Sequence, residues 1–211
     1  MGHADGICHV YVDAKADVDM AVKIIVDSKT QYVSVCNAAE TLLVHKDIAA
    51  AFLPKAAAAL KEKKVRLLGC PIARQYAEME EATEQDWSTE YLDYILSVKV
   101  VNSIDEAIDH INKYGSGHTD CIVTNDATAA QHFTSLIKSA DAFWNCSTRF
   151  SDGFRYGLGA EVGISTGKLH ARGPVGLEGL CTYKWLLTGH GDIVADYASG
   201  AKTFKHKPIS E

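Results

Sequence analysis

The alternation of strand-like and helix-like segments constrains the fold of this chain more than any other feature. Asp17 and Ser103 stand where helix N-caps are expected, and Glu106 completes a capping-box pattern after Ser103. This alternation predicts parallel βαβ units, with helices on both faces of one sheet, and therefore an α/β fold. The expected strands are 8–13, 41–45, 65–69, 95–101, 118–124 and 142–145, and the expected helices are 17–29, 47–64, 103–113 and 126–138.

The pattern changes after residue 146. Residues 147–179 are rich in glycine and polar side chains, and a loop of this length in a compact domain is usually functional. Apolar residues return in Leu180–Leu187, which predicts a strand, and the tail from His190 shows no clear pattern. We therefore divide the chain into an α/β domain at 1–146, a loop region at 147–179, and a strand with its tail at 180–211.

Charge and cysteine usage exclude several classes of function. The net charge is -6, from 21 basic and 27 acidic residues, and no basic block stands out, which argues against nucleic acid and anionic membranes as partners. No apolar run approaches the ~20 residues that span a bilayer. The six cysteines are spread singly and no histidine pair has zincin spacing, so we expect no metal site. Free thiols indicate a reducing, intracellular compartment.

Cys36 is the first candidate for chemistry. It lies between an expected helix and an expected strand, and small residues follow it at Ala38 and Ala39. A nucleophilic thiol needs a partly exposed position near backbone amides or cations that favour the thiolate. An isolated cysteine is more commonly buried and structural, so the residues alone leave both interpretations open.

A second candidate site is the segment Asn145–Phe150. Ser147, Thr148 and Arg149 follow an expected strand, and hydroxyls with a guanidinium can hold a carboxylate or a phosphate. The alternative is a polar surface loop in which Arg149 pairs with an acid. His170–Pro174 is a similar basic loop, and the chain contains no complete nucleotide-binding motif.

Several long runs together resemble one family. The chain resembles glutamate-5-semialdehyde dehydrogenase, also called gamma-glutamyl phosphate reductase, in the aldehyde dehydrogenase superfamily. It is most similar to the C-terminal reductase part of bifunctional pyrroline-5-carboxylate synthase. The runs that carry the resemblance are His3–Asp13, Cys36–Lys46, Trp144–Phe150, Gly157–Thr166 and His170–Tyr183.

The resemblance implies an aldehyde dehydrogenase-like catalytic domain and a reductive acyl transfer. Cys36 would attack gamma-glutamyl phosphate and form a thioester, which NADPH would reduce to glutamate 5-semialdehyde in proline biosynthesis. Hydrolytic relatives keep a glutamate base where this chain has Gly6–His9 without an acid. A reductase has no use for that base, because hydrolysis would waste the thioester.

The resemblance also assigns roles to individual residues. Glu90 would hold the nicotinamide ribose, and Leu180–Leu187 would be an oligomerisation strand that joins identical subunits in the cytoplasm or the mitochondrial matrix. The residues that would contact the substrate are Asn37, Asn145, Ser147, Thr148 and Arg149.

The chain departs from the family in length. The family's reductase region is much longer, and its N-terminal cofactor domain is largely missing here, so we expect this chain alone to bind NADPH weakly and turn over slowly. Two alternatives remain open: a non-catalytic assembly subunit of the same family, and a general aldehyde dehydrogenase that makes an acid. Thiol labelling of Cys36 and a test for acid product would discriminate between them.

Overall fold

The computed structural model describes residues 5–205, so His3 and Ala4 of the first run, and residues 206–211, lie outside the described part. The chain divides into two compact units, Met1–Cys181 and Thr182–Glu211. In the second unit the only helix among the described residues is α6. Lys202, which follows this helix, forms ion pairs with Asp192 and Asp196.

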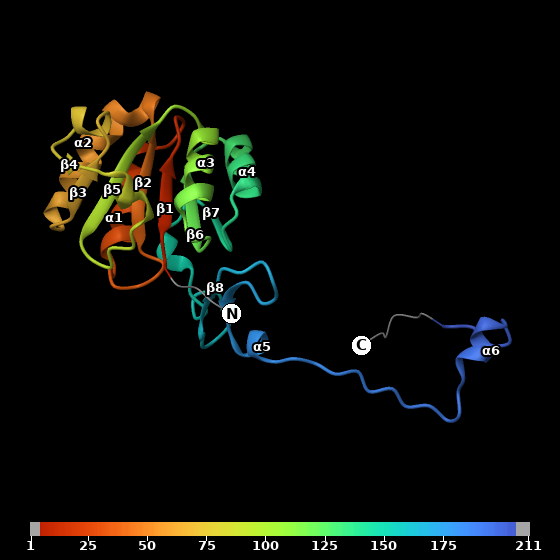
Figure 1. Ribbon diagram of the computed structural model, residues 1–211. Helices are drawn as coiled ribbons and strands as arrows, with labels where there is room; N and C mark the ends of the chain where they lie inside the picture. Colours follow the sequence, from red (N-terminus) through yellow and green to blue (C-terminus); the bar gives the residue numbers. More distant parts are fainter. Residues whose placement is uncertain (1–4, 206–211) are drawn as a thin grey trace. The chain divides into compact units, whose positions relative to one another are not determined.

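The first unit is built on one seven-stranded sheet in which every strand pair is parallel (Figure 1). The strand order is β4-β3-β5-β2-β1-β6-β7, which confirms the α/β class. The strands are β1 (Cys8–Val12), β2 (Ala39–His45), β3 (Arg66–Gly69), β4 (Glu80–Glu81), β5 (Ile95–Val101), β6 (Thr119–Val123), β7 (Asp141–Trp144), β8 (Gly163–Ser165) and β9 (Gly173–Val175). The helices are α1 (Val18–Thr30), α2 (Lys46–Glu62), α3 (Ile104–Tyr114), α4 (Ala127–Leu136), α5 (Leu177–Leu180) and α6 (Val194–Ala198), with 3-10 turns η1 (Ala73–Gln75), η2 (Glu84–Ser88) and η3 (Thr148–Phe150).

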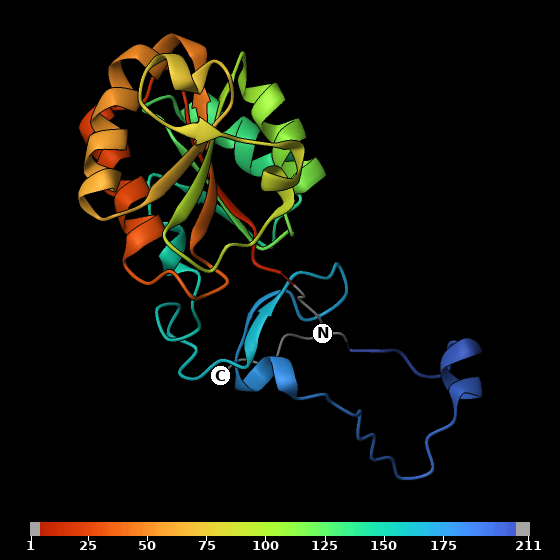
Figure 2. The same ribbon diagram turned by 60° about the vertical axis from the view of Figure 1, so that its left-hand side comes forward.

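Helices cover both faces of the sheet (Figure 2). Val10 and Val12 of β1 pack in the cluster that contains α1 and α2, whereas Tyr11 packs in the cluster that contains α3 and α4. The side chains of a strand alternate between its two faces, so β1, buried at every residue, has an apolar side chain on each face.

The helix starts follow the sequence pattern closely. The Asp17 carboxylate accepts the Met20 N–H at 2.7 Å, and the Ser103 hydroxyl accepts the Glu106 N–H at 3.2 Å. The Glu106 carboxylate, however, accepts the N–H of Asn102 rather than that of Ser103. Both predicted N-caps are therefore confirmed, while the capping box closes one residue earlier than predicted.

The strand predicted over Leu180–Leu187 is not formed. Leu180 ends α5, and residues 181–189 have no regular secondary structure. Trp185 is 89% exposed, so these apolar side chains pack against no core. The loop region contains more order than its composition predicted, because η3, the β8–β9 hairpin and α5 all fall within 147–180.

Residues 5–205 lack two features that would indicate a membrane or metal-binding role. No helix in that range has the length and apolar character needed to cross a membrane. No group of three or more His, Cys, Asp or Glu side chains in that range is arranged to hold a metal ion.

The segment leading into β1 lies directly against the loop that precedes β2. A Cβ atom built on Gly6 would lie 2.7 Å from the Cys36 carbonyl carbon, and nearer still to its oxygen and Cα. No real Cβ contact is that short, so only glycine fits between these two backbones.

A buried ion pair lies beside the same loop. Nζ of Lys29 in α1 lies 2.6 Å from Oε2 of Glu40 in β2, and both side chains are 0% exposed. Burial raises the pKa of Glu40 to about 7, although Lys29 opposes that shift, and burial lowers the pKa of Lys29. Two charges are therefore held out of water, and each depends on the other for compensation.

Substituting Gly6→Ala should destabilise the protein by about 1 to 3 kcal/mol, because a methyl group must displace backbone in a packed core. Urea unfolding followed by circular dichroism measures the loss. Gly167→Ala is the matched control, since no atom lies within 4 Å of its Cβ position. A Gly6→Ala variant as stable as that control would contradict the close approach.

Substituting Lys29→Met should lower the free energy of unfolding by about 3 to 5 kcal/mol at pH 8, because the Glu40 carboxylate loses its buried partner. The folded-state pKa of Glu40 is raised, so its stability contribution falls as pH rises from the usual carboxyl range to about 7. The deficit of the variant should therefore shrink at pH 5, where Glu40 takes a proton. Urea titrations at both pH values test this, and the double variant Lys29→Met, Glu40→Leu should recover most of the loss.

Candidate functional site

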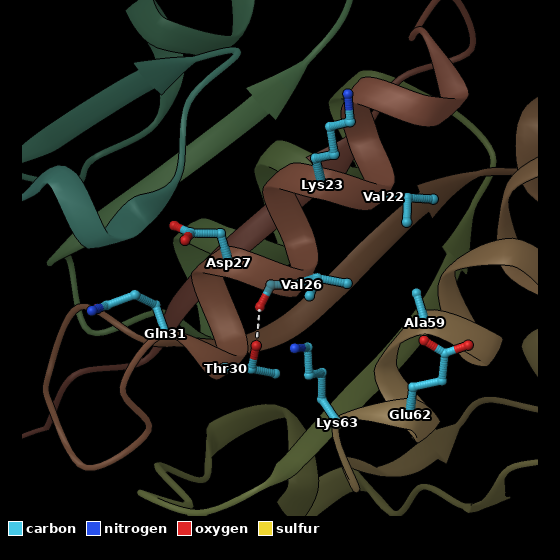
Figure 3. A pocket seen from close by; sticks show the side chains of 9 residues that line it. All are labelled: Val22, Lys23, Val26, Asp27, Thr30, Gln31, Ala59, Glu62 and Lys63. Carbon is cyan, nitrogen blue, oxygen red and sulfur yellow. Dashed lines mark hydrogen bonds between the residues drawn. The ribbon is translucent and has the colours of Figure 1, made fainter.

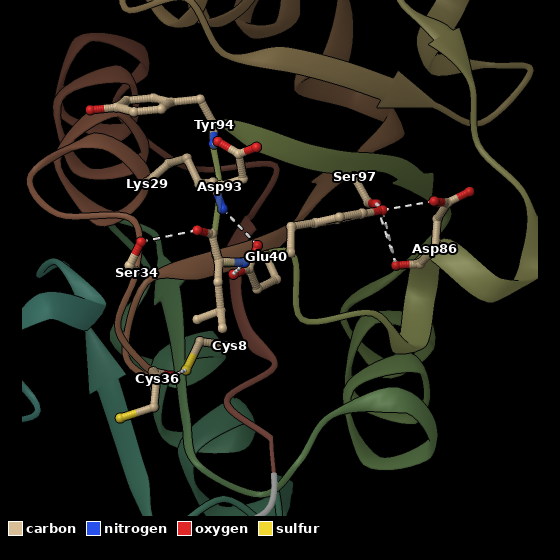
Figure 4. A network of polar contacts seen from close by, with 11 residues as sticks. Cys8, Lys29, Ser34, Cys36, Glu40, Asp86, Asp93, Tyr94 and Ser97 are labelled. Carbon is tan, nitrogen blue, oxygen red and sulfur yellow. Dashed lines mark hydrogen bonds and ion pairs between the residues drawn. The ribbon is translucent and has the colours of Figure 1, made fainter.

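Cys36 lies on the loop between α1 and β2, next to the strand's amino end. Its side chain is half-buried and points away from Cys8 (Figure 4). The Cys8 thiol donates to the Cys36 carbonyl oxygen at 3.2 Å, and Nδ2 of the buried Asn37 donates to the Ser151 carbonyl at 2.7 Å. The neighbouring backbone is thus fixed, whereas the Cys36 thiol itself remains accessible.

Opposing charges act on the Cys36 thiol. Burial raises its pKa most, and the negative charges of Glu161 and Glu90 raise it further. Its own backbone N–H and the Arg149 guanidinium lower the pKa, but the net shift is upward. The resting thiol is therefore protonated at neutral pH, and Glu161, Glu90 and Arg149 are all close enough to influence it.

The segment after β7 reverses and runs back toward the Cys36 loop. Asn145, at φ 56°, makes the reversal, and its side chain hydrogen-bonds both the N–H and the carbonyl of Thr124 at 2.9 Å. Further on, the Thr148 N–H donates to the Ser28 hydroxyl near the end of α1. Asn145 is therefore held at the carboxyl end of β6, away from Cys36, while residues 147–151 approach it.

Arg149 lines a cleft beside the end of α1. Its Nε donates to Gln31 Oε1 at 3.0 Å, and Nη1 of Arg155 donates to the Arg149 carbonyl at 2.9 Å. The cleft has a volume of about 200 Å³, and Asp27 and Phe150 complete its lining. The Arg155 guanidinium also pairs with Asp152 at 3.2 Å, and the Arg149 guanidinium beside it suits a carboxylate or phosphate ligand.

Ser147 and Thr148 are buried and support this segment. The Ser147 hydroxyl accepts the Arg149 N–H and the Ser28 O–H, both at 3.2 Å. The Thr148 hydroxyl and Oδ1 of Asn37 have no hydrogen-bond partner among the described residues. Both groups therefore have unused hydrogen-bonding capacity, and Asn37 directly follows Cys36 in the chain.

Glu90 is half-exposed in the segment that leads into β5. Its negative charge raises the pKa values of both Cys36 and Glu40, so it lies near the same amino edge of the sheet. A partly exposed carboxylate can accept hydrogen bonds from ribose hydroxyls, and the ribose-binding role of Glu90 stays a prediction.

The structure adds residues that the sequence patterns missed. Glu161 and Arg155 come from the glycine-rich loop region, and Gln31 caps the end of α1. No local motif marks them, because they act through contacts with residues distant in sequence. The site also lies at the amino ends of the strands, whereas open α/β sheets usually bind ligands at the carboxyl ends.

A larger groove of about 540 Å³ is lined by residues of α1 and α2 and of the turn after α2 (Figure 3). Asp27 and Gln31 line both this groove and the Arg149 cleft. Within the groove, the Thr30 hydroxyl donates to the Val26 carbonyl at 2.7 Å. None of the nine lining residues is a cysteine.

Comparison with known proteins gives a consistent result. Gamma-glutamyl phosphate reductase from Acetivibrio thermocellus is 63% identical over 211 residues, all of this chain and 49% of that protein. The protein of the same name from a Synechococcus strain is 62% identical over 209 residues, 98% of this chain and 46% of that protein. The chain thus spans about half the length of the curated relatives it matches. No family model matches it.

Solved structures agree with the sequence relatives. The crystal structure of gamma-glutamyl phosphate reductase from Thermotoga maritima has a TM-score of 0.88 and 47% identity, over 90% of this chain and 46% of that one. An acetylating aldehyde dehydrogenase from Geobacillus thermoglucosidasius shares the fold, with a TM-score of 0.64 and 21% identity over 91% of this chain and 52% of that one. The chain therefore belongs to the gamma-glutamyl phosphate reductase family and has an aldehyde dehydrogenase-like fold.

Proposed function

We propose that this chain carries the catalytic cysteine of an NADPH-dependent reductase that converts gamma-glutamyl phosphate to glutamate 5-semialdehyde and phosphate in proline biosynthesis. The observation that supports it most is the half-buried Cys36 thiol within the influence of Arg149, in a chain of this family. The proposal includes assembly of identical subunits through Leu180–Leu187 and the intracellular location that free thiols favour.

The first step is loss of the Cys36 proton. The pKa of this thiol is raised, so the proton must move to a base when substrate is bound. Glu161 is the carboxylate with the largest effect on the thiol, which makes it the first candidate to accept that proton. The thiolate then attacks the gamma-carbonyl carbon, the C–O bond to phosphate breaks, and a glutamyl thioester forms on Cys36 with release of phosphate.

The surrounding groups hold the substrate and stabilise charge. Arg149 and Arg155 would bind a substrate carboxylate or the leaving phosphate, with the Thr148 hydroxyl and the Asn37 side chain nearby. The backbone N–H of Cys36 would donate to the oxyanion of the tetrahedral intermediate. Glu90 would hold the nicotinamide ribose of NADPH, which would supply the hydride for reduction of the thioester.

The acyl-transfer half of the reaction gives a direct test. Incubation with gamma-glutamyl phosphate, generated in the same tube by a glutamate kinase with ATP, should release phosphate and add one glutamyl group to Cys36. Peptide mass spectrometry locates the adduct. Cys36→Ser should abolish the adduct and reduce phosphate release to the rate measured without this protein, because acyl phosphates also break down spontaneously. An adduct that falls equally on the exposed Cys181, or none on Cys36, contradicts the proposal.

The charges around Cys36 predict opposite effects of two substitutions on its alkylation by iodoacetamide at pH 7.5. Glu161→Gln removes a negative charge, lowers the thiol pKa and should speed alkylation about twofold to fivefold. Arg149→Gln removes a positive charge and should slow it by a similar factor. Rates are read by mass spectrometry for each cysteine, with Glu62→Gln as the control. Equal rates in all three variants contradict the electrostatic account.

A further inference from the structure

The loop that carries Cys36 is closed at its base by the Lys29–Glu40 pair. Lys29 lies in the last turn of α1 and Glu40 is the second residue of β2, so the pair joins the two elements that flank the loop 31–38. The Nζ–Oε2 distance is 2.6 Å, and neither side chain is exposed. A change in this contact therefore alters the distance between the end of α1 and the start of β2, which the Cys36 loop connects.

Glu40 also reaches the segment that carries Glu90. Its Oε1 accepts the N–H of Leu92 at 3.3 Å, and the Leu92 carbonyl accepts the Ser34 hydroxyl at 3.1 Å (Figure 4). Leu92 has φ 51°, a left-handed conformation that a non-glycine residue adopts only when its surroundings hold it there. Leu92 is thus held on one side by β2 and on the other by the Cys36 loop.

Stability alone does not account for this arrangement. A buried ion pair is often no more stabilising than a well-packed apolar pair of the same volume, because both charges lose their hydration. An apolar pair could close the loop equally well, but it could not accept the Leu92 N–H. The distinctive property of Glu40 is therefore its two acceptor oxygens, each directed at a different segment.

We propose that Glu40 is a positioning residue, whose two carboxylate oxygens hold the loop of Cys36 and the segment of Glu90 in a fixed relation and so set the reactivity of the Cys36 thiol. Glu40 lies within the fold and acts through Lys29, Leu92 and Ser34. The importance of Glu40 for catalysis rests on the proposed function. Its effect on the position and reactivity of Cys36 does not.

Two double variants separate the acceptor role from the charge. Lys29→Met with Glu40→Gln, the amide double variant, removes both charges but keeps an oxygen that can accept the Leu92 N–H. Lys29→Met with Glu40→Leu, the apolar double variant, removes the charges and the acceptor. The readout is the rate of iodoacetamide alkylation of Cys36 relative to Cys181, measured by mass spectrometry, together with hydrogen exchange at the Leu92 amide.

We expect the apolar double variant to change the ratio of the alkylation rates of Cys36 and Cys181 by about fivefold to tenfold. This is the size of effect that loss of one buried hydrogen bond implies. Its Leu92 amide should exchange faster, whereas the amide double variant should stay within about twofold of the wild type for both measures. An unchanged ratio with faster Leu92 exchange overturns the proposal, since the pair would then be only structural. Equal changes in both variants overturn it as well.

Ser34→Ala keeps the proposal testable if the apolar double variant does not fold. Ser34 is exposed, and its loss removes only the hydrogen bond to the Leu92 carbonyl. The alkylation rate of Cys36 relative to Cys181 should then change by about twofold, in the same direction as in the apolar double variant. An unchanged relative rate contradicts the proposal that the Leu92 contacts set the reactivity of Cys36. Alkylation needs no glutamyl transfer, so a failed acyl-transfer assay with an altered ratio rejects the proposed function and leaves the positioning role standing.

Discussion

The close approach of two backbones, just before the neighbouring strands β1 and β2, decides where Cys36 lies. Gly6 leads into β1 and leaves no room for a side chain against Cys36, which leads into β2. Because β1 and β2 pair in parallel and both are buried, their preceding segments emerge together at one edge. The parallel pairing of β1 and β2 therefore places the cysteine beside Gly6.

Side chains from segments distant in sequence meet at the amino ends of these strands. Glu90 arrives through the segment before β5, and Arg149 arrives because the chain reverses at Asn145 and runs back past α1. This reversal brings the Arg149 guanidinium to the amino ends of the strands, where an open α/β sheet usually has no ligand. The thiol lies among both signs of charge, so its reactivity depends on what binds beside it.

The buried Lys29–Glu40 pair links stability to this chemistry. The pair is a poor choice for stability, yet it lies where the Cys36 loop and the Glu90 segment meet. Burial that raises the pKa of Glu40 to about 7 also makes its charge sensitive to small changes in pH. A carboxylate placed in this way holds two segments at once, which no apolar residue could do.

The sequence by itself determined the class of fold, the helix starts at Asp17 and Ser103, and the place of Cys36 between a helix and a strand. These features rest on local periodicity and capping, which neighbouring residues decide. The resemblance drawn from its runs gave the family, and the relatives confirmed it.

Tertiary structure alone decided that Asn145 makes a turn at Thr124, and that Glu161 and Arg155 lie beside Cys36 and Arg149. It also decided that the apolar run after Leu180 forms no strand in a single chain. The physical reason is that such roles depend on partners distant in sequence, and a strand requires a neighbour to hydrogen-bond.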